Sequence, residues 1–65
     1  MEPWQERVVT EKSKLDARIY RLRAVLEKPE TYPLDLIARD LMSRQLAYML
    51  AYSSTLRERI ENFGA

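Results

Sequence analysis

The chain has 65 residues, a net charge of +1, 46% hydrophobic and 32% charged residues, and neither Cys nor His. This length allows one domain, expected to span residues 1–65, and a core this small rarely supplies more than about 3–5 kcal/mol, so oligomerisation is the most available source of further burial. Without Cys there are no disulfides, and without His the commonest general base is missing, so we expect no enzyme, no catalytic residue, no metal site and no cofactor.

The first predicted helix covers residues 3–27, where no Gly or Pro follows Pro3. Proline is favourable in the first turn of a helix, and Glu2 and Glu6 complement the positive end of the helix dipole. Side chains recurring at alternating steps of four and three residues predict one stripe along this helix. Its members are Val8, Lys12, Leu15, Ile19, Leu22 and Leu26, of which Lys12 is the only polar one.

Residues 28–33 are the expected connection, because Pro29 and Pro33 bias the residues before them away from helical geometry. A second helix is predicted over residues 34–62, with Asp35 in its first turn and Gly64 just beyond its end. It repeats the same spacing, in a stripe made of Met42, Leu46, Met49, Ser53, Leu56, Ile60 and Phe63.

A short connection between two such helices favours an antiparallel hairpin, so the predicted fold class is all-α. Placing Leu26 beside Met42 sets Leu15 beside Ser53, and both stripes then close along their whole length. Many apolar residues fall largely outside the stripes, namely Trp4, Val9, Tyr20, Val25, Leu34, Leu36, Ile37, Leu41, Tyr48, Leu50 and Tyr52. Because exposed apolar patches usually mark interaction surfaces, we expect the hairpin to assemble into a homo-oligomer.

The charge and hydropathy patterns argue against two classes of partner. A net charge of +1 does not favour binding of a DNA or RNA polymer. The longest apolar run, residues 46–52, is far too short to cross a bilayer, and no secretion signal is evident at the N-terminus. We therefore expect no membrane partner and a cytoplasmic location.

The first helix carries a candidate anion-binding face. Lys14, Arg18 and Arg21 share one face, and residues 1–28 hold seven Lys and Arg against five Asp and Glu. In a symmetric oligomer such a face is repeated, which can concentrate positive charge for phosphate groups. The alternative interpretation is an ordinary solvated face.

The second helix carries a candidate nucleotide-binding stripe. Gln45, Tyr52 and Arg59 recur at seven-residue intervals, with Tyr48 alongside, and the register brings Arg59 near Arg7. Amides hydrogen-bond base edges, phenol rings stack on bases and guanidinium groups bind phosphates. Tyr and Arg are also enriched where protomers pack together, so an interface between copies remains equally open.

Two segments resemble a group of small phage-encoded helical hairpins. Residues 4–15 read W-Q-x-R-V-x-x-E-K-x-x-L, and residues 45–60 read Q-x-x-x-M-x-x-Y-S-x-x-L-x-x-R-I. The group is similar to the anti-CBASS cyclic-oligonucleotide sponges and to the hairpin of a Thoeris anti-defence protein, and the resemblance covers nearly the whole chain apart from the connection. The match is carried by Gln5, Arg7, Glu11, Gln45, Tyr52 and Arg59.

The resemblance implies a compact homo-oligomer, in sponges often a hexamer, that holds cyclic di- or trinucleotide messengers between protomers without cleaving them. Such a protein acts in the cytoplasm of the infected bacterium and keeps the messenger from the host's CBASS-type immune effector. With the stripes above, the ligand-binding candidates are Trp4, Arg7, Lys12, Gln45, Tyr48, Tyr52 and Arg59. The alternative function is a ligand-free adaptor or assembly protein acting through protein–protein contacts.

Overall fold

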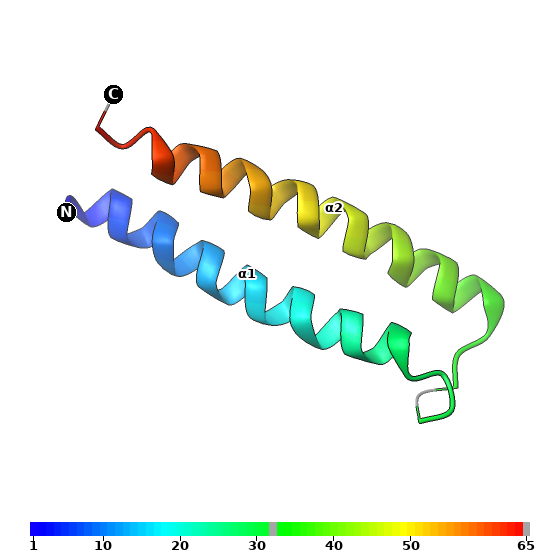
Figure 1. The fold of residues 1–65 in the computed structure, drawn as a ribbon. Helices are drawn as coiled ribbons and strands as arrows, with labels where there is room; N and C mark the ends of the chain where they lie inside the picture. Colours follow the sequence, from blue (N-terminus) through cyan, green and yellow to red (C-terminus); the bar gives the residue numbers. More distant parts are fainter. Residues whose placement is uncertain (32, 65) are drawn as a thin grey trace.

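The structure is a computed structural model that describes residues 1–31 and 33–64. These residues form two helices, α1 (Pro3–Glu27) and α2 (Leu36–Glu61), which lie antiparallel with both chain termini at the same end (Figure 1). The Cα atoms of the protomer extend over 45 × 16 × 13 Å, so the protomer is one elongated layer of two helices. The predicted all-α hairpin is confirmed for the described residues.

A side chain fixes the start of α1. The side chain of Gln5 reaches back to the start of the helix, where its Oε1 atom accepts a hydrogen bond of 2.8 Å from the N–H of Glu2. Pro3 follows as the first helical residue, a position where its missing N–H costs no helical hydrogen bond. Glu2 is therefore the N-cap, and α1 begins at Pro3.

The start of α2 corrects one boundary of the sequence analysis. The second helix was expected from residue 34, but Asp35 has extended backbone and its carboxylate accepts a 2.7 Å hydrogen bond from the N–H of Ala38. Asp35 is therefore the N-cap rather than a residue within the first turn, and α2 begins at Leu36. The helix ends at Glu61, one residue before the expected end.

Arg39 of α2 caps the end of α1 from across the connection. The last turn of α1 contains no basic residue of its own. Instead, Nη2 of Arg39 donates a 2.8 Å hydrogen bond to the carbonyl oxygen of Leu26. This contact satisfies an open carbonyl and places a positive charge at the negative end of the helix dipole. It joins the two helices at the closed end of the hairpin.

The core is the seam between the two helices. Its buried side chains are Val8, Leu15, Ile19 and Leu56, and Leu56 is only 1% exposed. Partly buried side chains pack against them, namely Leu46, Met49, Ile60 and Phe63. All eight belong to the two stripes predicted from the sequence, so the four-three spacing correctly identified the faces that meet.

Two further contacts agree with the predicted register. Midway along the hairpin, Oγ of Ser53 donates a 2.6 Å hydrogen bond to Oδ1 of Asp16. At the open end, the rings of Trp4 and Phe63 pack edge to face with their centroids 5.2 Å apart. Together with the Arg39 contact at the closed end, these interactions align the helices along their whole length.

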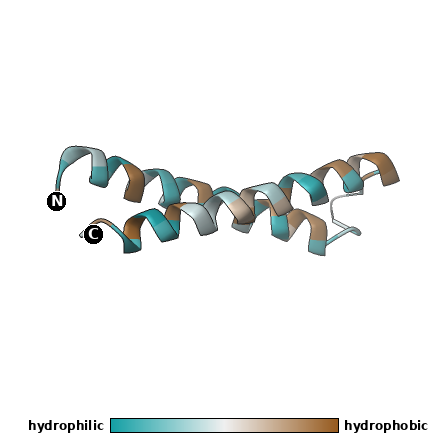
Figure 2. Ribbon diagram, turned by 90° about the horizontal axis from the view of Figure 1, so that it is seen from above, coloured by the Kyte–Doolittle hydropathy of each residue, from teal (hydrophilic) through white to brown (hydrophobic). Residues whose placement is uncertain are grey.

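Most of the apolar residues outside the seam are exposed in the protomer. They are Trp4, Val9, Tyr20, Leu36, Ile37, Leu41, Tyr48, Leu50 and Tyr52, with exposures from 39% to 86%, whereas Val25 and Leu34 are half-buried. Figure 2 shows apolar segments alternating with polar ones along both helices. Neither helix, within the described part of the chain, combines the length and apolar character needed to span a membrane.

Replacement of the most buried side chain is expected to destabilise the hairpin strongly. Leu56→Ala should lower the free energy of unfolding by about 2–5 kcal/mol, because it leaves a cavity in the seam. Leu36→Ala, at a side chain 86% exposed in the protomer, is the matched control and should change it by less than about 0.5 kcal/mol. Urea unfolding followed by circular dichroism measures both, and equal effects would contradict the assignment of the seam as the core.

Candidate functional site

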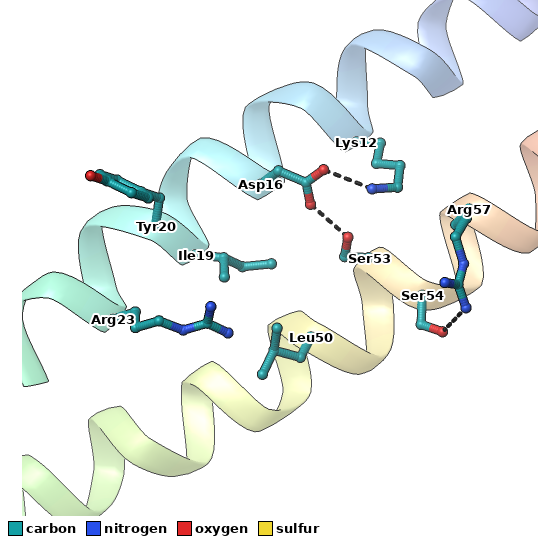
Figure 3. A pocket seen from close by; sticks show the side chains of 9 residues that line it. All are labelled: Lys12, Asp16, Ile19, Tyr20, Arg23, Leu50, Ser53, Ser54 and Arg57. Atoms are coloured by element: carbon teal, nitrogen blue, oxygen red, sulfur yellow. Dashed lines mark hydrogen bonds and ion pairs between the residues drawn. The ribbon is translucent and has the colours of Figure 1, made fainter. Parts of the chain in front are cut away.

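Within the described part of the chain, two concave surfaces are large enough to hold a small molecule. The first, called here the cationic groove, has a volume of about 400 Å³ and lies between the helices (Figure 3). It is lined by Lys12, Asp16, Ile19, Tyr20 and Arg23 of α1 and by Leu50, Ser53, Ser54 and Arg57 of α2. The second, called here the tyrosine patch, has a volume of about 360 Å³ and is formed by α2 alone. It is lined by Leu41, Arg44, Gln45, Tyr48, Met49 and Tyr52.

A polar bridge crosses the seam between the two arginines of the cationic groove (Figure 3). Nζ of Lys12 lies 2.7 Å from Oδ2 of Asp16, whose other carboxylate oxygen accepts the hydrogen bond from Ser53. The hydrogen bond from Lys12 and then that from Ser53 hold the pKa of the Asp16 carboxyl below its usual value of 3.8. Lys12 and Ser53, the two polar members of the predicted stripes, are thus connected through Asp16.

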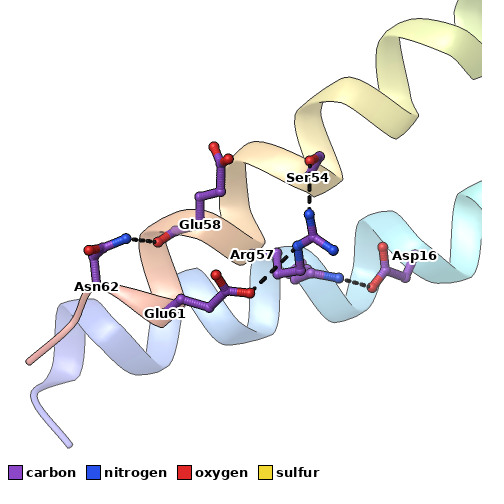
Figure 4. A network of polar contacts seen from close by, with 7 residues as sticks. Asp16, Ser54, Arg57, Glu58, Glu61 and Asn62 are labelled. Atoms are coloured by element: carbon purple, nitrogen blue, oxygen red, sulfur yellow. Dashed lines mark hydrogen bonds and ion pairs between the residues drawn. The ribbon is translucent and has the colours of Figure 1, made fainter.

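The two arginines of the groove have different surroundings. Arg57 donates a 3.5 Å hydrogen bond from Nη2 to Oγ of Ser54, and its Nε lies 3.7 Å from Oε1 of Glu61 (Figure 4). Arg23 extends from α1 toward α2 (Figure 3), and no salt bridge of Arg23 occurs among residues 1–31 and 33–64. Both guanidinium groups are therefore available to an anion at low cost, since exposed ion pairs such as Arg57–Glu61 contribute little stability.

The tyrosine patch is mainly apolar and aromatic. Tyr48 is 73% exposed and Tyr52 is 46% exposed, and Gln45 lies beside them with Nε2 3.8 Å from Sδ of Met49. The one cation of the patch, Arg44, is paired with Asp40 at 2.6 Å. The patch consequently offers ring faces and an amide, the groups that stack on bases and read their edges.

The structure separates the seven predicted site residues into groups. Gln45, Tyr48 and Tyr52 lie together in the tyrosine patch, as their spacing predicted. Lys12 lines the cationic groove instead. The remaining three line neither concavity: Trp4 packs against Phe63 at the open end of the hairpin, whereas Arg7 and Arg59 are exposed.

Sequence reasoning missed most of the groove, although a signal for it exists. Asp16 and Arg23 are seven residues apart on α1, and Leu50 and Arg57 are seven residues apart on α2. Seven residues are close to two turns of a helix, so each pair lies on one flank. The same spacing had identified the stripe on the opposite side of α2, but the two flanks become one groove only once the helices are paired.

The groove and the stripes identified from the sequence lie on different flanks of the hairpin. Residues two apart differ by about 200° around a helix. Asp16 and Leu50 line the groove. Arg18 is therefore turned away from the groove on α1, and Tyr52 is turned away from it on α2. The basic face of α1 and the stripe containing Tyr52 thus share the flank opposite the groove.

Separately, no cluster of three possible His, Cys, Asp or Glu metal ligands occurs within the described residues.

Comparison with known proteins gives one family. The family model described as Sequestin matches residues 2–62, which is nearly the whole chain. No curated protein and no solved structure matches. The resemblance to a sequestering family, inferred from residues 4–15 and 45–60, is confirmed by this match. The family's name suggests a protein that binds and sequesters a partner rather than an enzyme.

The polar bridge is expected to make stability depend on pH. Because the pKa of Asp16 is lowered by folding, its carboxylate stabilises the hairpin above the unfolded-state pKa, and this contribution is lost as the pH falls through the folded-state pKa. At pH 7 Asp16→Asn should lower the free energy of unfolding by less than about 1 kcal/mol, since Asp16 is 45% exposed. The difference from the wild type should shrink as the pH falls through the folded-state pKa of Asp16.

Urea unfolding at a series of pH values measures this difference. Asp40→Asn is the matched control, because Asp40 pairs with Arg44 on the same helix and makes no salt bridge across the seam among the described residues, and because both side chains are about 60% exposed. A difference between wild type and Asp16→Asn that is the same at pH 7 and at pH 2 would contradict the stabilising role of the Asp16 carboxylate.

Proposed function

The chain belongs to the Sequestin family, and we propose that it is a phage immune-evasion sponge for cyclic oligonucleotide messengers. It binds cyclic di- or trinucleotides between the protomers of a homo-oligomer and holds them without cleaving them. In the cytoplasm of the infected bacterium, this removes the messenger that activates a CBASS-type immune effector. The mechanism needs binding groups but no catalytic residue.

The observation that carries this proposal is the tyrosine patch. Gln45, Tyr48 and Tyr52 converge there on one exposed surface beside Met49. Stacking of a base on an aromatic side chain contributes about 1–3 kcal/mol, and the Gln45 amide can both donate and accept hydrogen bonds at a base edge.

The tyrosine patch is open to solvent on its outer side, so an enclosed pocket needs a second protomer to cover it. All its lining residues come from α2, so a base stacked on Tyr52 is covered on one side only. A second copy of the chain supplies the other wall. Leu41, Gln45, Tyr48 and Tyr52 repeat the four-three spacing of the seam on another side of α2, which is typical of a helix that packs on two sides. The family resemblance favours six protomers.

Cations around the patch and at the open end neutralise the phosphates of the bound messenger. Arg59 follows Tyr52 by seven residues, about 10 Å along α2 toward the open end of the hairpin. Arg7, near the start of α1, lies at the same open end. Lys12 contributes from the groove, and Trp4 offers a further ring at the open end. A sponge acts by mass action, so tight binding on the order of nanomolar, or about −12 kcal/mol, is required.

The second candidate function is a ligand-free adaptor that acts through protein–protein contacts. The observation that favours it is the pair of exposed side chains at the start of α2, where Leu36 is 86% exposed and Ile37 is 75% exposed. Neither residue lines either concavity. An adaptor would bury this end of the hairpin against another protein and would bind no messenger.

Calorimetry with purified protein separates the two functions. We expect one or more of cyclic di-AMP, cyclic di-GMP, cyclic GMP–AMP and cyclic tri-AMP to bind at roughly nanomolar concentration, and light scattering to report a mass that is a multiple of the 7.7 kDa protomer. No heat with any messenger would contradict the sponge. A monomer that still binds messenger would contradict the pocket between protomers.

Substitution of Tyr52 tests whether its ring stacks on a base. Tyr52→Leu should weaken messenger binding by about ten-fold or more, because it removes the ring, whereas Tyr52→Phe keeps the ring and should stay within about three-fold of wild type. Circular dichroism and light scattering verify that both variants fold and assemble. Equal affinity of the Leu and Phe variants would show that the ring of Tyr52 does not stack on the ligand.

Arg59→Ala tests the phosphate role of Arg59. We expect weaker messenger binding by roughly ten-fold with unchanged folding, because a hydrogen bond to a charged group contributes about 1.5–3 kcal/mol. Lys28→Ala, which removes the same charge at the closed end of the hairpin, should bind like the wild type. If Arg59→Ala instead dissociates the oligomer, Arg59 is an interface residue.

A further inference from the structure

We propose that the cationic groove of one protomer binds the phosphate groups of the sequestered nucleotide, whose base stacks on the tyrosine patch of the neighbouring protomer. This inference rests on the proposed function and adds a site whose two unneutralised cations, Arg23 and Arg57, were not among the seven ligand-binding candidates from the sequence. It also gives the order in which neighbouring protomers face each other.

The charge of the groove favours an anion. Three of its lining residues are cations, Lys12, Arg23 and Arg57, and Asp16 is its one acid. The Asp16 carboxylate is already engaged by Lys12 at 2.7 Å and by Ser53 at 2.6 Å. Arg23 and Arg57 therefore supply positive charge that the groove itself does not neutralise. Guanidinium groups are suited to phosphate because they donate two parallel hydrogen bonds.

The position of the two arginines suits a ligand with more than one phosphate. In the register of the hairpin, Arg57 lies opposite residue 11, so its Cα is about 18 Å along the axis from that of Arg23. Both side chains are long, and Arg23 extends toward α2 over the groove (Figure 3). They can therefore hold two phosphates that are spaced along the groove, whereas a single phosphate would meet only one of them.

The remaining lining residues suit the rest of a nucleotide. Buried Ile19 and partly exposed Leu50 form apolar surface, beside which a charge–charge contact is stronger than in open water. Ser54 offers a hydroxyl to a phosphate or sugar oxygen, and Tyr20, 76% exposed, offers a ring at the rim. The volume of about 400 Å³ is within the range of small-molecule sites.

Neither surface alone provides both kinds of contact. The groove has three cations but a single ring, Tyr20, at its rim, while the tyrosine patch has two rings but only one cation, which is paired with Asp40. The two surfaces lie on different flanks of the hairpin, so a head-to-tail contact presents the patch of one protomer to the groove of the next. Such heterologous contacts close into rings when the rotation permits, with one pocket at each contact.

The decisive experiment mixes two defective variants. Arg23→Gln/Arg57→Gln breaks the groove and leaves the patch intact, whereas Tyr52→Leu breaks the patch and leaves the groove intact. Calorimetry with the tightest binder among cyclic di-AMP, cyclic di-GMP, cyclic GMP–AMP and cyclic tri-AMP should show each variant at least about ten-fold weaker than wild type. Lys28→Gln, which removes an exposed positive charge at the closed end of the hairpin, outside the cationic groove and the tyrosine patch, should stay within about three-fold.

After the two defective variants are unfolded together and refolded as a mixture, tight binding should return at about a quarter of the wild-type number of sites. This is the fraction of contacts at which an intact groove meets an intact patch in a randomly mixed ring. No recovery in oligomers shown by mass spectrometry to be mixed would overturn the shared pocket. Wild-type affinity of the groove variant would overturn the phosphate site while leaving the sponge function intact.

Two further measurements keep the groove testable by itself. Glu61→Gln removes the carboxylate 3.7 Å from Arg57 and should tighten messenger binding a few-fold; unchanged or weaker binding contradicts a phosphate contact by Arg57. If no messenger binds the wild type, the proposed function fails, and pyrophosphate then probes the groove directly. Heat with wild type but not with Arg23→Gln/Arg57→Gln supports an anion site, and no heat with wild type overturns it.

Discussion

A pair of helices can bury only one stripe of each, and every other property of this protein depends on that constraint. The seam contains four buried side chains, of which Leu56 is the most enclosed. Both flanks of the hairpin and the outer side of α2 remain exposed, including large side chains such as Tyr48 and Leu41. A protomer of this size therefore has little core but a large binding surface for its length. Because two helices cover so little of each other, the protomer exposes surface to partners on several sides.

The polar members of the seam determine how that surface is arranged. Lys12 and Ser53 interrupt two otherwise apolar stripes, and Asp16 joins them through contacts of 2.7 and 2.6 Å. Lys12 and Asp16 pair within α1, so the hydrogen bond from Ser53 is the part of the bridge that joins the helices, and a shift in register would separate Ser53 from Asp16. The register in turn brings the flank of Arg23 to that of Arg57 and forms the groove. The same bridge therefore favours one register and lines the proposed phosphate site.

The sequence predicted the helices and the seam well because both depend on local spacing. Pro3 and the prolines of the connection bound the helices, and the four-three pattern identified all eight core side chains. The start of α2, expected at about residue 34, lies at Leu36, since Asp35 caps the helix with a side-chain contact instead of continuing it. The tyrosine patch was predictable because it lies on one helix. The groove was not, since Arg23 and Arg57 look like solvated charges until the helices are paired.

The central claim is that the protein withholds a nucleotide messenger without changing it. The most direct test incubates a cyclic dinucleotide with excess protein, passes the mixture through a filter that retains the protein, and then releases the ligand by heat unfolding. The account predicts a filtrate depleted of messenger and full recovery of intact messenger after unfolding. Messenger that passes freely through the filter, or that is recovered as a cleavage product, would contradict the account.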